Sequence, residues 1–89
     1  MRIKDGFALR EVAGTRVVLP LAKAFSGFNG MITLNESAYL LWKRLETGAT
    51  REELVALLTE EYEVTEEIAA SDVDRFLERM GAAGCIDMQ

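Results

Sequence analysis

The chain has 89 residues, 49% of them hydrophobic and 28% charged, which suits one globular domain (1–89) with one modest core. Its net charge is −5, and no apolar run approaches the roughly 20 residues that a membrane helix needs. The composition therefore argues against a membrane span, and the absence of histidine removes the commonest general base and metal ligand.

The N-terminal segment and the cysteine content indicate the cellular compartment. The N-terminal segment MRIKDGFALR is charged throughout, so we expect no secretory signal. Cys85 is the single cysteine and has no partner for an internal disulfide. Both features favour a reducing, cytoplasmic location.

The first predicted elements are two strands of a hairpin. Residues 7–13 show partial alternation of apolar and polar side chains, and residues 16–19 read RVVL, a strand-favouring run. Gly14–Thr15 between them is predicted as a two-residue hairpin turn with glycine first. Pro20 has no amide hydrogen for a ladder, so the second strand should end there.

A third strand is predicted at Met31–Leu34, after a connecting segment over residues 21–28. The Asn29-Gly30 dipeptide favours a tight turn, because both residues tolerate positive φ. Asn35 follows the strand directly and has the side chain of a helix N-cap. The sequence thus predicts a short strand that continues into a helix without an intervening loop.

The remaining chain predicts three helices. The first begins after Asn35 and should stop near Gly48; the second begins at Thr50 with a capping box to Glu53; and the third begins after Thr65. Their expected buried faces are spaced three and four residues apart. These faces comprise Ala38, Leu41, Trp42 and Leu45; Leu54, Leu57, Leu58 and Tyr62; and Ala69, Val73, Phe76, Leu77 and Met80.

The third helix is expected to end at Gly81 and Gly84, and Cys85-Ile86 to form a short final extended segment. Three strands followed by three helices define an α+β fold, a winged helix-turn-helix with a three-stranded antiparallel sheet.

The sequence contains no recognisable catalytic motif. Cys85 has neither a histidine to activate it nor a second cysteine to share a metal, and is interpreted as a small buried side chain. Glycine-rich phosphate loops are absent. The paired glutamates lie near helix ends or on solvent faces, which favours a structural role. We therefore expect no enzyme activity, no cofactor and no metal.

A winged helix-turn-helix first suggests a DNA-binding regulator, but the charge argues against nucleic acid as the partner. Residues 50–89 have three basic residues against eleven acids, a balance of −8. The third helix carries five acids against Arg75 and Arg79. Affinity for DNA comes largely from cations that neutralise phosphates.

The strand at Met31–Leu34 suggests another role. An edge strand has backbone groups that need partners, and this strand has no proline or charge to block pairing. An extended peptide would pair with it and pack alternate side chains against the third helix. The alternative is that Ile32 and Leu34 are core residues and the third helix only packs on the sheet.

The whole chain resembles the PqqD-like family, which consists of small peptide-recognition elements for ribosomally made, modified peptides. The resemblance rests on FALREVAGTRVVLPL, on FNGMITLNESAYLLWKRLETGATREELVALLTEEYEV and on DVDRFLERMGAAGCID. It implies capture of a precursor peptide's leader, as an antiparallel strand beside the third helix, and presentation to a modifying enzyme, often a radical-SAM enzyme.

Carried over to this chain, the resemblance implies two groups of peptide-binding residues. They are the strand residues Gly30, Met31, Ile32, Thr33 and Leu34, and the helix residues Asp72, Val73, Arg75, Phe76, Leu77, Arg79 and Met80. Arg75 and Arg79 are candidates for contact with acidic leader residues, and core packing is an equal alternative for Val73 and Leu77. The resemblance does not separate coenzyme PQQ biosynthesis from other pathways.

Two further alternatives remain open from the sequence. The chain would also fit a structural subunit that holds an enzyme without touching its peptide. An open strand edge in addition permits self-pairing or a domain swap, so a homodimer is compatible with the sequence.

Overall fold

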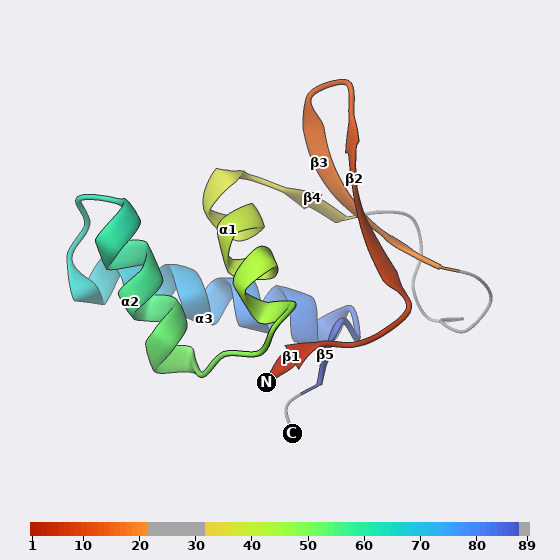
Figure 1. Ribbon diagram of the computed structural model, residues 1–89. Helices are drawn as coiled ribbons and strands as arrows, with labels where there is room; N and C mark the ends of the chain where they lie inside the picture. The colour runs from red at the N-terminus through yellow and green to blue at the C-terminus, as the bar shows by residue number, and fades with distance from the viewer. Residues whose placement is uncertain (22–31, 88–89) are drawn as a thin grey trace.

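Two antiparallel sheets and three helices make up residues 1–21 and 32–87, which the computed structural model describes (Figure 1). The strands are β1 (Arg2–Ile3), β2 (Phe7–Val12), β3 (Thr15–Pro20), β4 (Ile32–Leu34) and β5 (Ile86–Asp87). The helices are α1 (Glu36–Leu45), α2 (Arg51–Glu61) and α3 (Glu66–Ala82). The predicted α+β fold, with a three-stranded sheet ahead of three helices, is confirmed.

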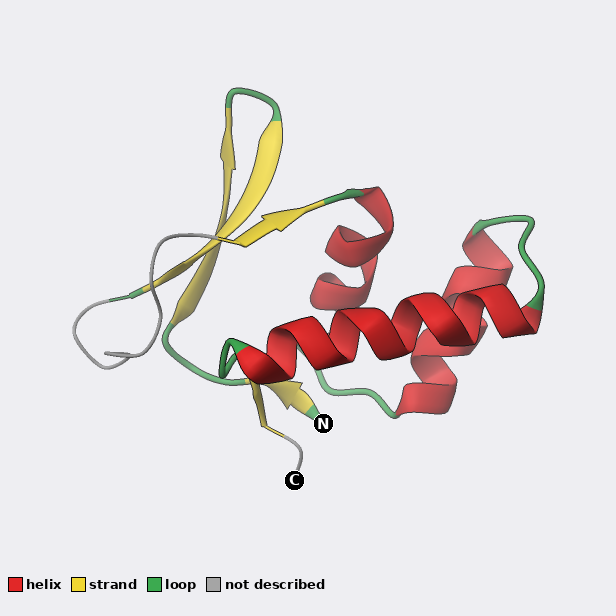
Figure 2. Cartoon of the chain, turned by 180° about the vertical axis from the view of Figure 1, so that it is seen from behind, coloured by secondary structure: helices red, strands yellow, loops and turns green. Residues whose placement is uncertain are grey.

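The β2–β3 hairpin projects away from the helices (Figures 1 and 2). Its second strand, β3, ends at Pro20 as predicted, but its loop is Ala13–Gly14, because Val12 pairs with Thr15. The predicted turn at Gly14–Thr15 is therefore wrong by one residue. Ala13 and Gly14 have φ values of 53° and 82°, and a turn with positive φ at both positions matches the twist of the strands.

Strand β4 lies at one edge of the sheet, whose order is β2-β3-β4. It pairs with β3 in the register Arg16↔Leu34, Val17↔Thr33 and Val18↔Ile32. The predicted third strand is thus confirmed over Ile32–Leu34. Met31, the Asn29-Gly30 turn and most of the connecting segment lie outside the described residues.

All three predicted N-caps are present. Asn35 Oδ1 accepts from the Ala38 amide at 2.8 Å, and Thr65 Oγ1 accepts from the Ile68 amide at 3.2 Å. Thr50 and Glu53 form the reciprocal capping box, with distances of 2.8 Å and 3.1 Å. Each cap satisfies amides that the first helical turn leaves without a partner. The predicted start of each helix is therefore confirmed.

The helix ends depart further from the expectation. Helix α1 ends at Leu45, and Gly48 follows with a left-handed φ of 92°. Helix α3 passes through Gly81 and ends at Ala82, between the two glycines that were predicted to mark its end. Glycine inside a helix costs about 1 kcal/mol, and burial of Met80 in the preceding turn holds the helix in place. Gly84, with a φ of 77°, makes the turn into β5.

A two-stranded sheet of β1 and β5 brings the two ends of the described chain together beside α3 (Figure 2). Ile3 pairs with Ile86, and both side chains are buried. The final extended segment was anticipated, but β1 was not. A two-residue strand carries no readable alternation, and its partner lies more than 80 residues away in the sequence.

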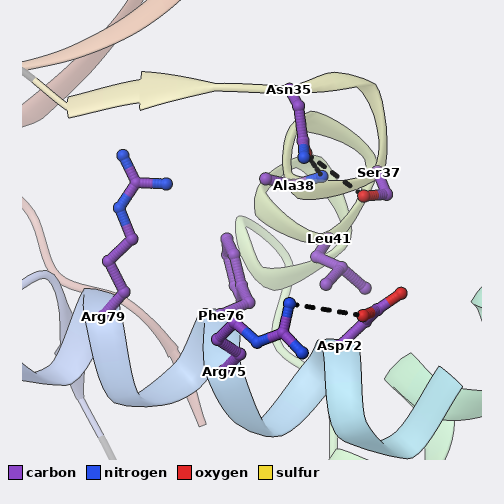
Figure 3. Close-up of a pocket in the computed structure, with 8 residues that line it drawn as sticks. All are labelled: Asn35, Ser37, Ala38, Leu41, Asp72, Arg75, Phe76 and Arg79. Carbon is purple, nitrogen blue, oxygen red and sulfur yellow. Dashed lines mark hydrogen bonds and ion pairs between the residues drawn. The ribbon is translucent and has the colours of Figure 1, made fainter. Parts of the chain in front are cut away.

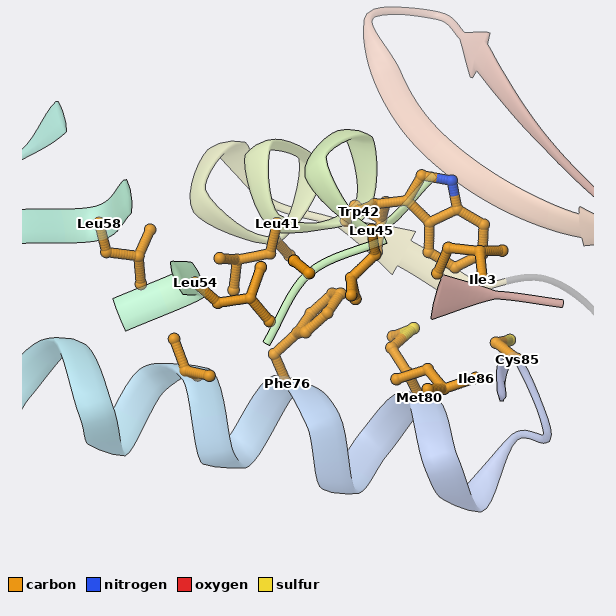
Figure 4. Close-up of a cluster of buried hydrophobic side chains, with 14 of the residues drawn as sticks. Ile3, Leu41, Trp42, Leu45, Leu54, Leu58, Phe76, Met80, Cys85 and Ile86 are labelled. Carbon is orange, nitrogen blue, oxygen red and sulfur yellow. The ribbon is translucent and has the colours of Figure 1, made fainter. Parts of the chain in front are cut away.

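The core lies between the three helices and the strands beside them, and every buried side chain of the described residues is apolar (Figure 4). Its largest fully buried members are Trp42, Leu41, Leu45, Leu54, Leu58, Met80, Val18, Val73 and Cys85. Most predicted core positions on the helices are buried, but Leu57, Leu77 and Tyr62 are only half-buried. Val55 is buried and was not predicted, since the apolar stripe of α2 is wider than the expected one.

Polar contacts on the surface join the elements around this core. Arg51 donates to both carboxylate oxygens of Asp74 at 2.6 Å and 2.9 Å and so links α2 to α3. These hydrogen bonds hold the pKa of Asp74 below its ordinary value. The Arg16 guanidinium lies 4.0 Å above the Tyr39 ring and so links β3 to α1.

The buried thiol of Cys85 should make the fold less stable as the pH becomes alkaline. Burial raises the pKa of its thiol to about 11, from an ordinary value of 9.0. As the pH rises between these values, the unfolded chain releases a proton that the folded chain keeps, so the free energy of unfolding falls. At about 1.4 kcal/mol per pKa unit, the loss is at most about 3 kcal/mol.

Urea unfolding at several values between about pH 8 and about pH 11 measures this dependence. The Cys85→Ala variant lacks the thiol and should show a shallower decline than the native chain. Equal declines in the two proteins would show that other groups cause the effect.

Candidate functional site

The candidate site begins at the edge of the sheet, where β4 faces α3. Arg79 extends from α3 toward β4, and its Nη2 donates to the Thr33 carbonyl oxygen at 2.8 Å (Figure 3). Thr33 is exposed, whereas Leu34 is buried and Ile32 half-buried, as the two-residue period of a strand requires. The Thr33 carbonyl is therefore accessible to a donor from the α3 side.

A small cavity of about 160 Å³ continues from this edge between α1 and α3. We call it the β4–α3 groove. Its lining residues are Asn35, Ser37, Ala38, Leu41, Asp72, Arg75, Phe76 and Arg79. Leu41 and Phe76 belong to the buried core and form an apolar floor, while polar side chains make up the rim (Figure 3). An apolar base with a few polar groups is typical of a binding site.

The rim of the groove has more positive than negative charge. Arg75 and Asp72 form an ion pair at 3.9 Å, with side chains 77% and 43% exposed. A pair this open and this long contributes little, so the Arg75 guanidinium remains available to a ligand. Arg79 adds a second cation at the β4 end. The groove thus favours an anionic group, although α3 as a whole is acidic.

The structure brings together most of the residues that the sequence singled out. Ile32, Thr33 and Leu34 form β4, and Asp72, Arg75, Phe76 and Arg79 line the groove beside it. Val73 and Met80 are fully buried in the core, and Leu77 is half-buried against it. These three residues support the helix and do not line the groove. Gly30 and Met31 lie outside the described residues.

The first turn of α1 supplies lining residues that the sequence reasoning missed. Asn35 was interpreted as a helix cap, Ala38 and Leu41 were interpreted as core positions, and Ser37 was assigned no role. Their position was a usable signal, because the residues that directly follow an edge strand must border whatever pairs with it. Ser37 donates to Asn35 Oδ1 at 3.2 Å and has no acid–base partner there.

The described residues offer binding groups and not a catalytic constellation. Among residues 1–21 and 32–87, no group of three or more acids or cysteines is placed to hold a metal ion. No helix of these segments is long and apolar enough to cross a membrane. The arrangement that remains is an accessible strand edge, an apolar floor and a cationic rim, which together suit an extended polypeptide.

Fold and site together define a small winged helix-turn-helix protein, and within its described residues no strand pairs with the edge of β4 beside the last helix. The family "Coenzyme PQQ synthesis protein D (PqqD)" matches residues 15–86, and the chain belongs to this family. The predicted resemblance to PqqD-like proteins is confirmed. None of the curated proteins matches the chain significantly.

Two solved structures resemble the whole fold. "TbiB1 in Complex with the TbiA(beta) Leader Peptide" has a TM-score of 0.79 and 24% identity, and the match covers 100% of this chain and 98% of that one. "Lasso peptide synthetase B1 complexed with the leader peptide" has a TM-score of 0.74 and 25% identity, with 94% and 93% covered. The first of these matches supports the fold alone.

The Arg79–Thr33 hydrogen bond should stabilise the position of β4. We expect Arg79→Met, which keeps the aliphatic stem, to lower the free energy of unfolding by about 1 kcal/mol. Arg75→Met is the matched control on the same helix, and its exposed, long ion pair should change stability by less than about 0.5 kcal/mol. Urea unfolding of the three proteins measures both values, and equal losses would contradict a clamping role for Arg79.

Proposed function

We propose that this protein is a non-catalytic adaptor that captures the leader of a precursor peptide and presents it to a peptide-modifying enzyme in the cytoplasm. The leader adds an antiparallel strand to β4 and lies in the β4–α3 groove. One observation carries the proposal: the Thr33 carbonyl on β4 already accepts a hydrogen bond from outside the sheet. An incoming strand would supply the same kind of donor from its backbone.

The family and one similar structure support leader capture. The chain belongs to the PqqD family, and the structure that is 25% identical to it is described as complexed with the leader peptide. The enzyme partner is of the radical-SAM class or another peptide-modifying class, in coenzyme PQQ biosynthesis or another pathway. The absence of histidine and the buried, protonated Cys85 thiol support an adaptor that leaves the chemistry to its partner.

Strand addition predicts a specific effect of proline at the edge. In an antiparallel pair, the amide and carbonyl of one residue point to the same side of the strand. Thr33→Pro therefore removes the amide that lies beside the accessible carbonyl, while Ile32 and Leu34 keep their places opposite β3. We expect leader affinity to fall about tenfold or more, whereas Thr33→Val should retain it.

The probe is the precursor peptide encoded beside the gene, titrated into isotope-labelled protein and followed by amide-resolved NMR. Leader capture predicts shifts in residues 32–35 and 72–79, with affinities measured for both Thr33 variants after their native fold is checked in the same spectra. Shifts confined to other surfaces, or equal affinity in both variants, would contradict strand addition. If only the enzyme caused shifts, the protein would be a structural subunit without peptide contact.

DNA binding makes the opposite prediction about salt. The residues Glu66, Glu67, Asp74 and Glu78 are exposed on α3, the helix that would enter a DNA groove. They would repel phosphates, so we expect no duplex binding even at low ionic strength. A fluorescence-anisotropy titration with duplex DNA at about 0.01 M and 0.1 M salt tests this, since real binding would weaken steeply between the two.

A further inference from the structure

A second and larger cavity adjoins the β4–α3 groove at the N-terminal end of α1. It has a volume of about 350 Å³ and is lined by Asn35, Glu36, Ser37, Leu58, Tyr62, Val64 and Asp72. Its base is formed by the buried Leu58 and the half-buried Tyr62 and Val64. Tyr62 and Val64 belong to the connection between α2 and α3, a segment to which the proposed strand addition assigns no role.

The two cavities are neighbours on the surface. Both are lined by Asn35, Ser37 and Asp72, so the second cavity lies next to the first. Asn35 follows β4 directly, which places the second cavity beyond the Leu34 end of the strand. A chain that follows the edge of β4 from Ile32 to Leu34 and then continues past Asn35 reaches Tyr62 and Val64.

The direction of an added strand decides which end of a peptide arrives there. Antiparallel pairs are the more stable and more frequent kind. A peptide antiparallel to β4 has its C-terminal residues beside Ile32 and its N-terminal residues beside Leu34. The part of the peptide that reaches the second cavity is therefore N-terminal to the part that pairs.

We propose that this cavity is an apolar subsite, which binds an aliphatic or aromatic side chain of the leader, N-terminal to the segment paired with β4. The inference rests on the proposed function and adds a second point of recognition to it. Peptides without such a side chain would still pair with β4, but more weakly.

Charge separates what the two cavities accept. Asp72 lines both cavities, but the apolar subsite adds Glu36, whereas the β4–α3 groove adds Arg75 and Arg79. The pKa of Tyr62 is raised by burial and, in smaller measure, by Glu36 and Glu61, which reflects the negative surroundings. The matching peptide carries its apolar anchor among neutral or basic residues, and any acidic residue lies toward its paired segment.

Selection from a displayed library of random peptides tests the proposal without knowledge of the natural leader. A length of about 12 residues suits it, because at roughly 3.4 Å per residue such a peptide spans the 40 Å long axis of the molecule. Peptides that shift the amides of Thr33 and Arg79 are retained as the probes. We expect an apolar position N-terminal to their paired segment.

Val64→Ser and Ile68→Ser form a matched pair of variants. Val64 lines the apolar subsite, whereas Ile68 is 51% exposed on α3 and does not line it. We expect the selected peptides to bind Val64→Ser about tenfold more weakly than the native chain, and Ile68→Ser unchanged. Replacing the apolar anchor of the peptide by serine should cost about tenfold with native protein and little with Val64→Ser. Equal affinities of all three proteins would overturn the proposal.

A nitroxide label on the peptide shows in which direction the peptide lies along β4, without the use of any variant. A label at the N-terminus should broaden the amides of Tyr62 and Val64, and a label at the C-terminus should leave them sharp. Broadening by the C-terminal label alone would overturn the antiparallel placement, while strand addition itself would stand. Failure of every selected peptide to shift the β4 and α3 amides would instead refute the proposed function.

Discussion

The junction between Leu34 and Asn35 is the constraint on which the rest of the site depends. Leu34 ends β4 inside the core, and the next residue caps α1 through a 2.8 Å hydrogen bond to the Ala38 amide. No loop separates strand from helix, so the direction of β4 is set by the direction of α1. Leu41 of α1 and Phe76 of α3 belong to the same buried core and line the same cavity, which joins α1 to α3. The distance between the strand edge and α3 follows from this sequence of contacts.

The same junction lies at the centre of both cavities. Asn35 lines the β4–α3 groove and the apolar subsite, and its amide side chain is already engaged by Ala38 and Ser37. A cap that cannot rotate freely gives the two cavities a fixed wall. Precise binding sites are generally built on such rigid elements, with side chains held by their neighbours. The wall that the two cavities share is thus held in place by contacts within the protein.

Features that depend on residues close in the sequence were predicted well from the sequence. Features that depend on pairing between distant residues were not. Asn35, Thr50 and Thr65 identified the helix starts because a cap and its amide lie three residues apart. Strand β1 escaped prediction because its pairing with β5 has no local trace. The hairpin loop was misplaced because alanine at positive φ is unusual, and only the strand register shows that Ala13 adopts it.

The same limit applies to the candidate site: the helix that forms its wall could be predicted from the sequence, but the residues that line it could not all be identified. Periodicity identified α3 as one wall, but it did not separate Phe76, which lines the groove, from Val73 and Met80, which are sealed in the core. That distinction depends on which part of α3 faces α1 and which faces the sheet and β5. The residues Tyr62 and Val64 were even less accessible to sequence reasoning, because they reach the second cavity only through the packing of α2 beside α1 and α3.

Under the proposed function, Arg79 affects how much of the binding energy comes from backbone hydrogen bonds and how much from side-chain contacts. In the free protein its guanidinium satisfies the Thr33 carbonyl, which also protects the edge against pairing with another copy. A leader amide that takes this carbonyl replaces one exposed hydrogen bond by another, a nearly neutral exchange, since each contributes only about 1 kcal/mol net. The exchange at the Thr33 carbonyl then helps to set direction and register but adds little affinity. Much of the affinity must come from side chains buried on Phe76 and Leu41 and in the apolar subsite, and from carboxylates that meet the released guanidinium. Selectivity among peptides follows from this division, because every peptide has the same backbone and only the side chains differ.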